Sequence, residues 1–196
     1  MTRADRYTRT AMVLHWLVAL LVIGNLVLVW TIGWFPGGMV RPAIDTHKSI
    51  GITVLGLALL RLLWRVSHRP PPLPAGYSRP ERTAAHGAHI LLYGLILALP
   101  LSGWIHDSAF KDAAAHPLRL FGLVPWPRIG PIMALDPVTK EHVHAVWFSI
   151  HGALAYGLYV LLALHLLGVM KHQLFDRDPV LKRMMPDWGS QRRRDF

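Results

Sequence analysis

The sequence predicts an all-α membrane protein, a four-transmembrane-helix bundle with both termini in the cytoplasm. Of its 196 residues, 53% are hydrophobic and only 16% are charged, and the mean hydropathy is +0.33, which is unlike a soluble domain. Four apolar segments are each long enough to cross a hydrocarbon layer about 30 Å thick. Fifteen of the 21 Lys and Arg residues lie at the two termini and between the second and third segments, and the positive-inside rule places these parts in the cytoplasm.

Hydropathy defines the elements in order along a single domain, residues 1–196. The predicted spans are about 11–34, 44–64, 84–105 and 145–170. The first is too long for a cleaved signal peptide, and Trp34-Phe35-Pro36 follows it in place of small residues. The periplasmic connection, about 106–144, is long for a helix bundle, and its apolar stretch 118–127 predicts one or two short helices packed on the outer face. The tail, about 187–196, is expected to be flexible.

Composition also excludes several classes of function. The chain has no Cys, which excludes disulfides, thiolate metal sites, iron–sulfur ligation and covalently attached c-type haem. Its net charge of +10 is distributed around four spans, so topology and contact with anionic membrane lipid explain it and no nucleic acid is expected as a partner. Asp45 is the only acidic residue within the predicted spans, which disfavours a proton relay or an ion-coupled transporter.

The most informative residues are His151 and His165, fourteen residues apart in a span without Asp, Glu, Lys or Arg. On a helix they lie about 21 Å apart along the axis and within about 40° of the same face. One imidazole therefore points inward near each edge of the membrane. Polar groups at such depths are costly and usually functional.

Antiparallel topology gives each of these histidines a partner at its own depth. His15 lies near the cytoplasmic end of the first span, level with His165, and His47 lies at the periplasmic start of the second, level with His151. Two imidazoles without thiolate, carboxylate or a third ligand suit a six-coordinate haem iron, whereas zinc wants three or four protein ligands. The alternative is that each histidine makes only a helix–helix hydrogen bond. Four histidines at two matched depths favour two non-covalent haem b groups.

Arg61 follows His47 by fourteen residues, the same spacing as in the fourth span. It should project from the ligand face of its helix at the depth of the cytoplasmic haem, where a guanidinium can hold a haem propionate with two hydrogen bonds. The alternative is that it extends to lipid headgroups. The glycines beside the ligands, Gly51, Gly152 and Gly168, allow either clearance for a flat macrocycle or close helix packing.

Other histidines have weaker interpretations. His86 and His89 share a helix face, and a hydrogen bond to a propionate, a quinone or another helix is favoured over metal binding there. His142 and His144 lie at the periplasmic mouth of the fourth span. They are expected to be solvated, with contact to the periplasmic haem as the alternative.

These stretches resemble the bacterial cytochrome b561 family, small four-helix di-haem b cytochromes of the inner membrane. Beside the four histidines, the matching motifs are His15-Trp16-Leu17, Arg41-Pro42, His47-Lys48-Ser49-Ile50-Gly51, Ala98-Leu99-Pro100-Leu101-Ser102-Gly103-Trp104 and Leu181-Lys182-Arg183-Met184-Met185-Pro186. The resemblance implies that the axial ligands of two bis-His haems fall on His15, His47, His151 and His165. Some members oxidise periplasmic superoxide and pass the electrons to membrane quinone, so ubiquinone is a candidate substrate. The long connection between the third and fourth spans departs from the shortest members.

We therefore expect a transmembrane electron-transfer protein of the bacterial inner membrane, with a periplasmic donor or redox partner protein. A b-type subunit of a larger complex such as a hydrogenase is one alternative. A non-redox membrane protein whose histidines bind metal is another. If superoxide is the donor, basic side chains of the periplasmic face should attract it. The candidates are Arg41, Lys48, Arg128, Lys140, His142 and His144, offset by Asp45, Asp136 and Glu141.

Overall fold

A computed structural model describes residues 6–73 and 76–185. Its long helices are α1 (Arg9–Thr31, extended by the 3₁₀ turn η2, Ile32–Trp34), α2 (Gly37–Ser67), α3 (Arg79–Ser108) and α5 (Pro137–Met170, extended by the π turn η3, Lys171–Phe175). Its short elements are β1 (Arg119–Leu120), β2 (Val124–Pro125), α4 (Gly130–Met133) and α6 (Val180–Met184). The tail predicted to be flexible, 187–196, lies outside the described residues.

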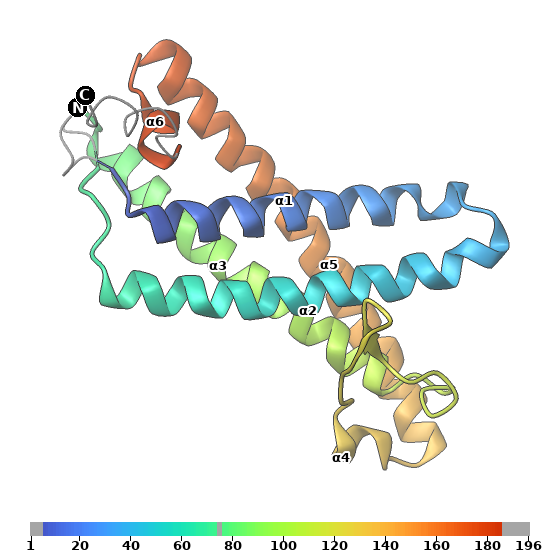
Figure 1. The fold of residues 1–196 in the computed structure, drawn as a ribbon. Helices are drawn as coiled ribbons and strands as arrows, with labels where there is room; N and C mark the ends of the chain where they lie inside the picture. The colour runs from blue at the N-terminus through green and yellow to red at the C-terminus, as the bar shows by residue number, and fades with distance from the viewer. Residues whose placement is uncertain (1–5, 74–75, 186–196) are drawn as a thin grey trace, which may run out of the picture.

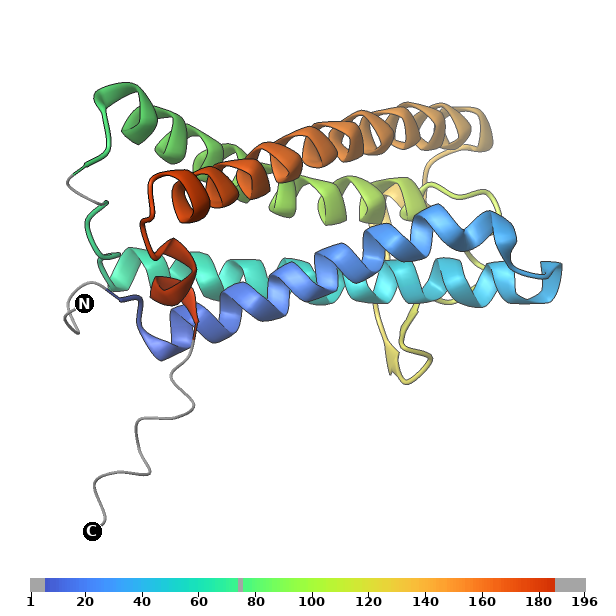
Figure 2. The same cartoon turned by 90° about the horizontal axis from the view of Figure 1, so that it is seen from above.

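The four long helices are each long and apolar enough to cross a membrane, with 18-residue stretches whose mean hydropathies lie between 1.7 and 2.4, so the predicted four-helix architecture is confirmed. α1 and α2 form one antiparallel pair, and α3 and α5 form a second pair that crosses it (Figure 1). The view from above separates the two pairs, and α2 and α3 pack where they meet (Figure 2). The start of α1, the α2–α3 connection and α6 lie at one end of the bundle, here called the α6 end. Residues 109–136 lie at the other, the hairpin end.

Three of the long helices begin well before the predicted spans. α2 begins at Gly37 rather than near 44, and in α3 and α5 polar turns precede the apolar residues. α3 begins at Arg79 rather than near 84, since Ser78 and Glu81 form a capping box. α5 begins at Pro137 rather than near 145, with the Asp136 side chain accepting hydrogen bonds from the first turn. The connection between them is therefore shorter than the predicted 106–144.

That connection contains one short helix, α4, as expected, but also an antiparallel hairpin that the sequence analysis did not predict. Arg119 is paired with Pro125, and Leu120 with Val124. At the turn, Phe121 and Gly122 have positive φ angles of 51° and 74°. The hairpin is fixed to α2, because the Phe121 amide donates to the buried Ser49 hydroxyl at 2.9 Å.

A buried charge cluster joins the connection to the bundle. Asp107, in the last turn of α3, has a side chain only 8% exposed, and it binds Lys48 of α2 at 2.7 Å and Arg128 of the connection at 2.9 Å. Arg128 also donates to the carbonyls of Ala113 and His116. The carboxylate thus holds α2, α3 and the connection together beside His47.

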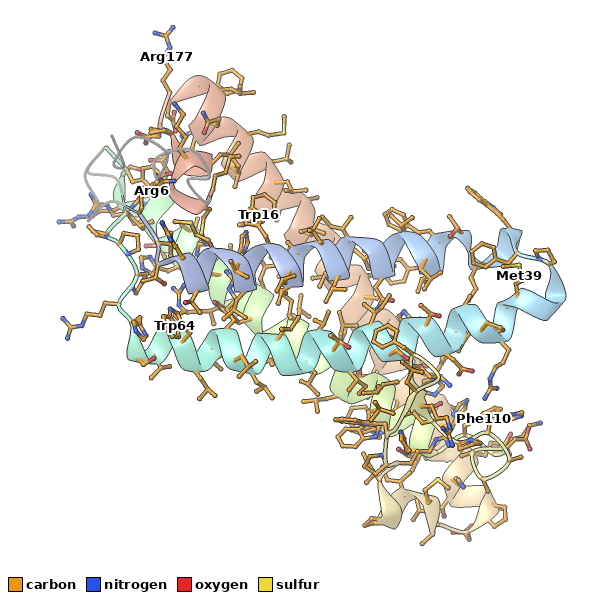
Figure 3. The ribbon with its side chains drawn as sticks, in the orientation of Figure 1. Arg6, Trp16, Met39, Trp64, Phe110 and Arg177 are labelled. Atoms are coloured by element: carbon orange, nitrogen blue, oxygen red, sulfur yellow. The ribbon has the colours of Figure 1, made fainter. Side chains whose placement is uncertain are left out.

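At the α6 end, the segment after α5 folds back onto α1. The indole of Trp16, labelled in Figure 3, donates to the Met184 carbonyl at 2.8 Å. The Tyr7 amide donates to the Arg183 carbonyl at 3.3 Å. Met184 and Arg183 therefore supply main-chain acceptors to the first helix and to the residue shortly before it.

Candidate functional site

Histidines gather at both ends of the bundle. The hairpin-end cluster contains His47 of α2 and His151 of α5, whose ring centroids are 6.1 Å apart with perpendicular planes. Metal–imidazole bonds are about 2 Å long, so this separation leaves room for one metal ion between the two rings. The structure thus brings the predicted pair together from helices far apart in sequence.

Each of these rings is fixed through its Nδ1 atom. His47 Nδ1 lies 3.0 Å from the Asn25 side-chain oxygen of α1, and His151 Nδ1 lies 3.0 Å from the Ser102 hydroxyl and 3.1 Å from the Leu99 carbonyl of α3. Oxygen acceptors place the proton on Nδ1, which leaves Nε2 as the free electron-pair donor. Metal-ligating histidines are normally held in this way.

Glycine makes room for His151. A Cβ atom at Gly103 would lie 3.2 Å from His151 Cε1, closer than ordinary van der Waals contact, so only glycine fits without displacing the ring. A Cβ at Gly152 or Gly168 would meet no atom within 4 Å, and one at Gly51 would only touch Pro100. Close packing within the chain therefore does not require glycine at 152 or 168. Open space lies beside these two positions of α5, which are close in sequence to His151 and His165.

The α6-end cluster contains His15, His165, His89 and Arg61. The rings of His89 and His165 have centroids 5.7 Å apart, and His15 lies within electrostatic range of both and of Arg61. In the described part of the chain, His15 Nδ1 is buried without a hydrogen-bond partner. The cluster therefore contains one histidine, His89, beyond the predicted ligands His15 and His165.

Arg61 stands with Arg65 over the ring of Tyr93, with guanidinium carbons 5.2 and 5.6 Å from the ring centroid. These groups line a cavity of about 280 Å³ that Trp64, the Pro70–Pro72 spacer and Met184 also border, and no Asp or Glu is among its lining residues. Within residues 6–73 and 76–185, neither arginine has a carboxylate partner. The cavity is thus suited to an anionic group.

Both histidine pairs join helices whose backbones stay apart. α5 packs closely along α3, whereas its backbone contacts with α1 and α2 are sparse at most in the described residues. His15 of α1 and His165 of α5 nevertheless lie within electrostatic range of each other, and the rings of His47 of α2 and His151 of α5 lie side by side. This arrangement suits a cofactor held between helices.

The donor sets fit haem better than zinc. Across the described ranges, the one group of three potential metal ligands within 4.8 Å of one another is Glu81, His172 and Asp176. There the Lys171 ammonium already binds both carboxylates. Neither transmembrane pair has a carboxylate to complete a tetrahedral site, whereas two imidazoles complete the axial positions of a haem iron.

Comparison with known proteins agrees with this geometry. The family model described as prokaryotic cytochrome b561 matches residues 6–187, nearly the whole chain. The chain belongs to the prokaryotic cytochrome b561 family. This cytochrome b561 is accordingly a multi-pass membrane protein, and membership implies haem b and haem-based electron transfer. The resemblance drawn from the sequence motifs is confirmed.

Individual relatives span the same length as this cytochrome b561. "Cytochrome b561 homolog 2" of Escherichia coli K12 is 34% identical over 185 residues, covering 92% of each chain. "Cytochrome b561 homolog 1" of the same organism is 30% identical over 190 residues, covering 93% of this chain and 98% of its own. "Probable superoxide oxidase CybB" of Yersinia pestis is 28% identical over 182 residues, covering 92% and 96%.

The Lys and Arg side chains expected to attract superoxide already have partners. Lys48 and Arg128 bind Asp107, Arg41 binds Asp45, and Lys140 donates to the Met133 carbonyl at 3.4 Å. Their main visible role in this cytochrome b561 is to hold the hairpin end together.

Asn25 and Ser102 are the site residues that sequence reasoning missed. A signal existed for each, because an amide inside an apolar span is costly unless it is bonded, and Ser102 belongs to one of the family motifs. His89 was weighed, but its closeness to His165 could come only from the packing of α3 on α5.

Proposed function

We propose that this cytochrome b561 carries electrons across the membrane through two bis-histidine haem b groups held in one domain, residues 1–196. His47 and His151 ligate the haem at the hairpin end, and His15 and His165 ligate the one at the α6 end. The observation that carries the proposal is the fixing of both hairpin-end rings through Nδ1, which leaves each Nε2 free. Haem supplies one-electron redox chemistry, and the chain supplies ligation, orientation and a low-dielectric surrounding.

Arg61 belongs to the same proposal as a cofactor-binding residue at the α6 end. It lies near His15 and has no carboxylate of its own. A haem propionate would supply that partner, and a guanidinium deep in a membrane gains most from one.

The haem ligands are tested by replacing each histidine with alanine. His15→Ala or His165→Ala removes the α6-end haem, and His47→Ala or His151→Ala removes the other, so the pyridine haemochrome assay falls by half. His142→Ala, at an exposed position of α5, is the matched control and keeps the full haem content. Loss of one and the same haem, judged by spectrum and potential, from both His15→Ala and His47→Ala would refute the pairing.

We further propose that the α6 end faces the cytoplasm, as the distribution of Lys and Arg indicates. The chain has no Cys, so single cysteines report the topology directly. In intact cells, an impermeant maleimide should label Ala114→Cys of the hairpin-end connection and leave Gly76→Cys unlabelled until the membrane is opened. The reverse pattern would invert the orientation.

The proposed donor is periplasmic superoxide and the proposed acceptor is membrane ubiquinone. The name of the Yersinia relative supports this choice. Each superoxide loses one electron and leaves as dioxygen, and two electrons with two protons convert a quinone to a quinol. In stopped-flow measurements, superoxide should reduce the haems, and added quinone should reoxidise them.

A b-type subunit of a larger complex would use the same haem ligands but take its electrons from a peripheral subunit. Failure of superoxide to reduce the haems, together with co-purification of a catalytic subunit, would favour that alternative. A salt-dependent rate would indicate electrostatic attraction of the anion. An optical spectrum without b-type haem bands would favour the other alternative, a non-redox membrane protein whose histidines bind metal.

A further inference from the structure

A second pair of histidines lies at the hairpin end, outside the ligand set. His106 of α3 and His144 of α5 have Nδ1 atoms 2.9 Å apart and ring centroids 4.2 Å apart. His144 Nδ1 is also 3.0 Å from the His106 carbonyl oxygen. A carbonyl can only accept, so the proton lies on His144 Nδ1 and is shared with His106 Nδ1. The neutral His106 ring therefore carries its own proton on Nε2.

This pair stands over the hairpin-end haem site. His144 precedes His151 by seven residues on α5, which places it about 10.5 Å farther along the axis and about 20° away around it. His106 follows Ser102, which contacts His151, by one turn of α3. The pair thus lies between the ligand layer and the aqueous end of the bundle, and its rings are only partly exposed.

Three of the basic side chains of this end already bind carboxylates. Lys48 and Arg128 bind Asp107, with Arg41 bound to Asp45. Lys48 and Asp107 face His106 closely enough to interact electrostatically, as does His151. The two ends of the bundle therefore differ, since the α6 end offers the partly buried Arg61 and Arg65 without carboxylate partners. Among the described residues of the hairpin end, Arg119 of β1 also lacks a carboxylate partner, but it is exposed.

A haem has two propionates, and carboxylates within a membrane protein are held near the aqueous edge and by hydrogen-bond donors. We propose that the His106–His144 pair holds a propionate of the hairpin-end haem, with His106 Nε2–H as the principal donor. The inference rests on the proposed di-haem function. It assigns to two imidazoles at the hairpin end the role that the same proposal gives to a guanidinium group at the α6 end.

The test uses the haem-loaded full chain with haem carrying ¹³C-labelled propionates. In the His106→Ala/His144→Ala double variant, the midpoint potential of the hairpin-end haem shifts downward, because an unsupported carboxylate leaves more negative charge beside the iron. The potential of the α6-end haem does not change. Redox-difference infrared spectra show a shifted band for the labelled carboxylate. His142→Ala, exposed and two residues from His144 on the same helix, changes neither quantity.

Unchanged potential and carboxylate band in a double variant that keeps both haems would overturn the inference. If the double variant loses only the hairpin-end haem, His106→Gln keeps an N–H donor and should restore binding, and failure of that rescue would also overturn it. The haem content of the unaltered protein is measured first. One haem per chain there would refute the proposed function itself, independently of the histidine pair.

Discussion

At the residue scale, the chemistry of the hairpin-end cluster depends on side chains that are not ligands themselves. Asn25 and Ser102 accept hydrogen bonds from His47 and His151 and so determine which ring nitrogen is free. Such outer contacts orient a ligand and adjust its basicity. Their polar atoms also tie α1 to α2 and α3 to α5 inside an apolar bundle.

Replacing Asn25 with aspartate tests this adjustment. A carboxylate opposite His47 Nδ1 makes the imidazole a stronger electron donor and favours ferric iron, so the midpoint potential of the hairpin-end haem should fall in a spectroelectrochemical titration. Asn25→Leu removes the acceptor and should weaken haem retention by about tenfold or more. Equal potentials in Asn25→Asp and the unaltered protein, with both haems bound, would contradict the assigned contact.

Arg61→Gln makes the corresponding change at the α6 end. Removing a positive charge beside the proposed propionate disfavours the more electron-rich ferrous state, so the potential of the proposed α6-end haem should shift downward while that of the other haem stays constant. Arg79→Gln, at the exposed start of α3, is the control. A shift confined to the hairpin-end haem would show that Arg61 acts elsewhere.

At the element scale, hydropathy predicted the spans well and their ends poorly. It detects apolar residues, so the polar first turns of α3 and α5 were assigned to connections. Two sequence signals could have corrected this, namely Ser78 with Glu81 as a capping box and Asp136 before Pro137. The hairpin could not be predicted, because strands of two residues carry no alternation and the positive φ of Phe121 is unfavourable for a non-glycine residue without a tertiary contact.

Asp136 makes the start of α5 sensitive to acid. Hydrogen bonds from Thr139, and then from the Val138 amide, lower the pKa of its carboxyl below the ordinary value. The folded pKa is therefore lower than the unfolded one. The cap stabilises the helix fully above the ordinary Asp pKa of about 3.9 and loses this effect as pH falls through the folded pKa.

Hydrogen exchange at the Val138 and Thr139 amides should accordingly rise relative to the rest of α5 on acidification. Asp136→Asn keeps a cap that does not titrate and should abolish the extra pH dependence. Asp136→Ala should exchange rapidly already at neutral pH. Identical profiles for the unaltered protein and Asp136→Asn would exclude the carboxylate as the titrating group.

At the scale of the whole molecule, Asp107 is the residue on which α2, α3 and the hairpin-end connection converge. Asp107→Asn leaves Lys48 and Arg128 without their shared charge partner and should lower stability by about 3–5 kcal/mol, as for other broken buried pairs. Thermal unfolding and protease cleavage between residues 109 and 136 measure the effect. Asp112→Asn, exposed on the same connection, should change neither. Ser49 accepts a hydrogen bond from the Phe121 amide of the connection, and Ser108 accepts one from the Ile129 amide at 3.1 Å. A neutral result would mean that these two hydroxyls suffice to hold the connection.

The placement of the four histidines by depth needed only helix length and antiparallel order, which the sequence contains. Predicting which helices pack side by side needs more information than helix length and order. That α5 packs on α3 and stands away from α1 and α2 depends on side-chain fit along whole helices, and residues such as His89 and His106 took on significance only once that neighbour was known.

The spacing of His151 and His165 along α5 has an electrical consequence. Fourteen residues correspond to about 21 Å of a membrane core of about 30 Å, so an electron passing between the proposed haems crosses about two-thirds of the voltage across the membrane. At 2.3 kcal/mol per charge for each 100 mV, this amounts to about 1.5 kcal/mol per electron. In a cell with a negative interior, inward transfer runs against this voltage, and a membrane potential of 100 mV would alter the distribution of electrons between the two haems about tenfold.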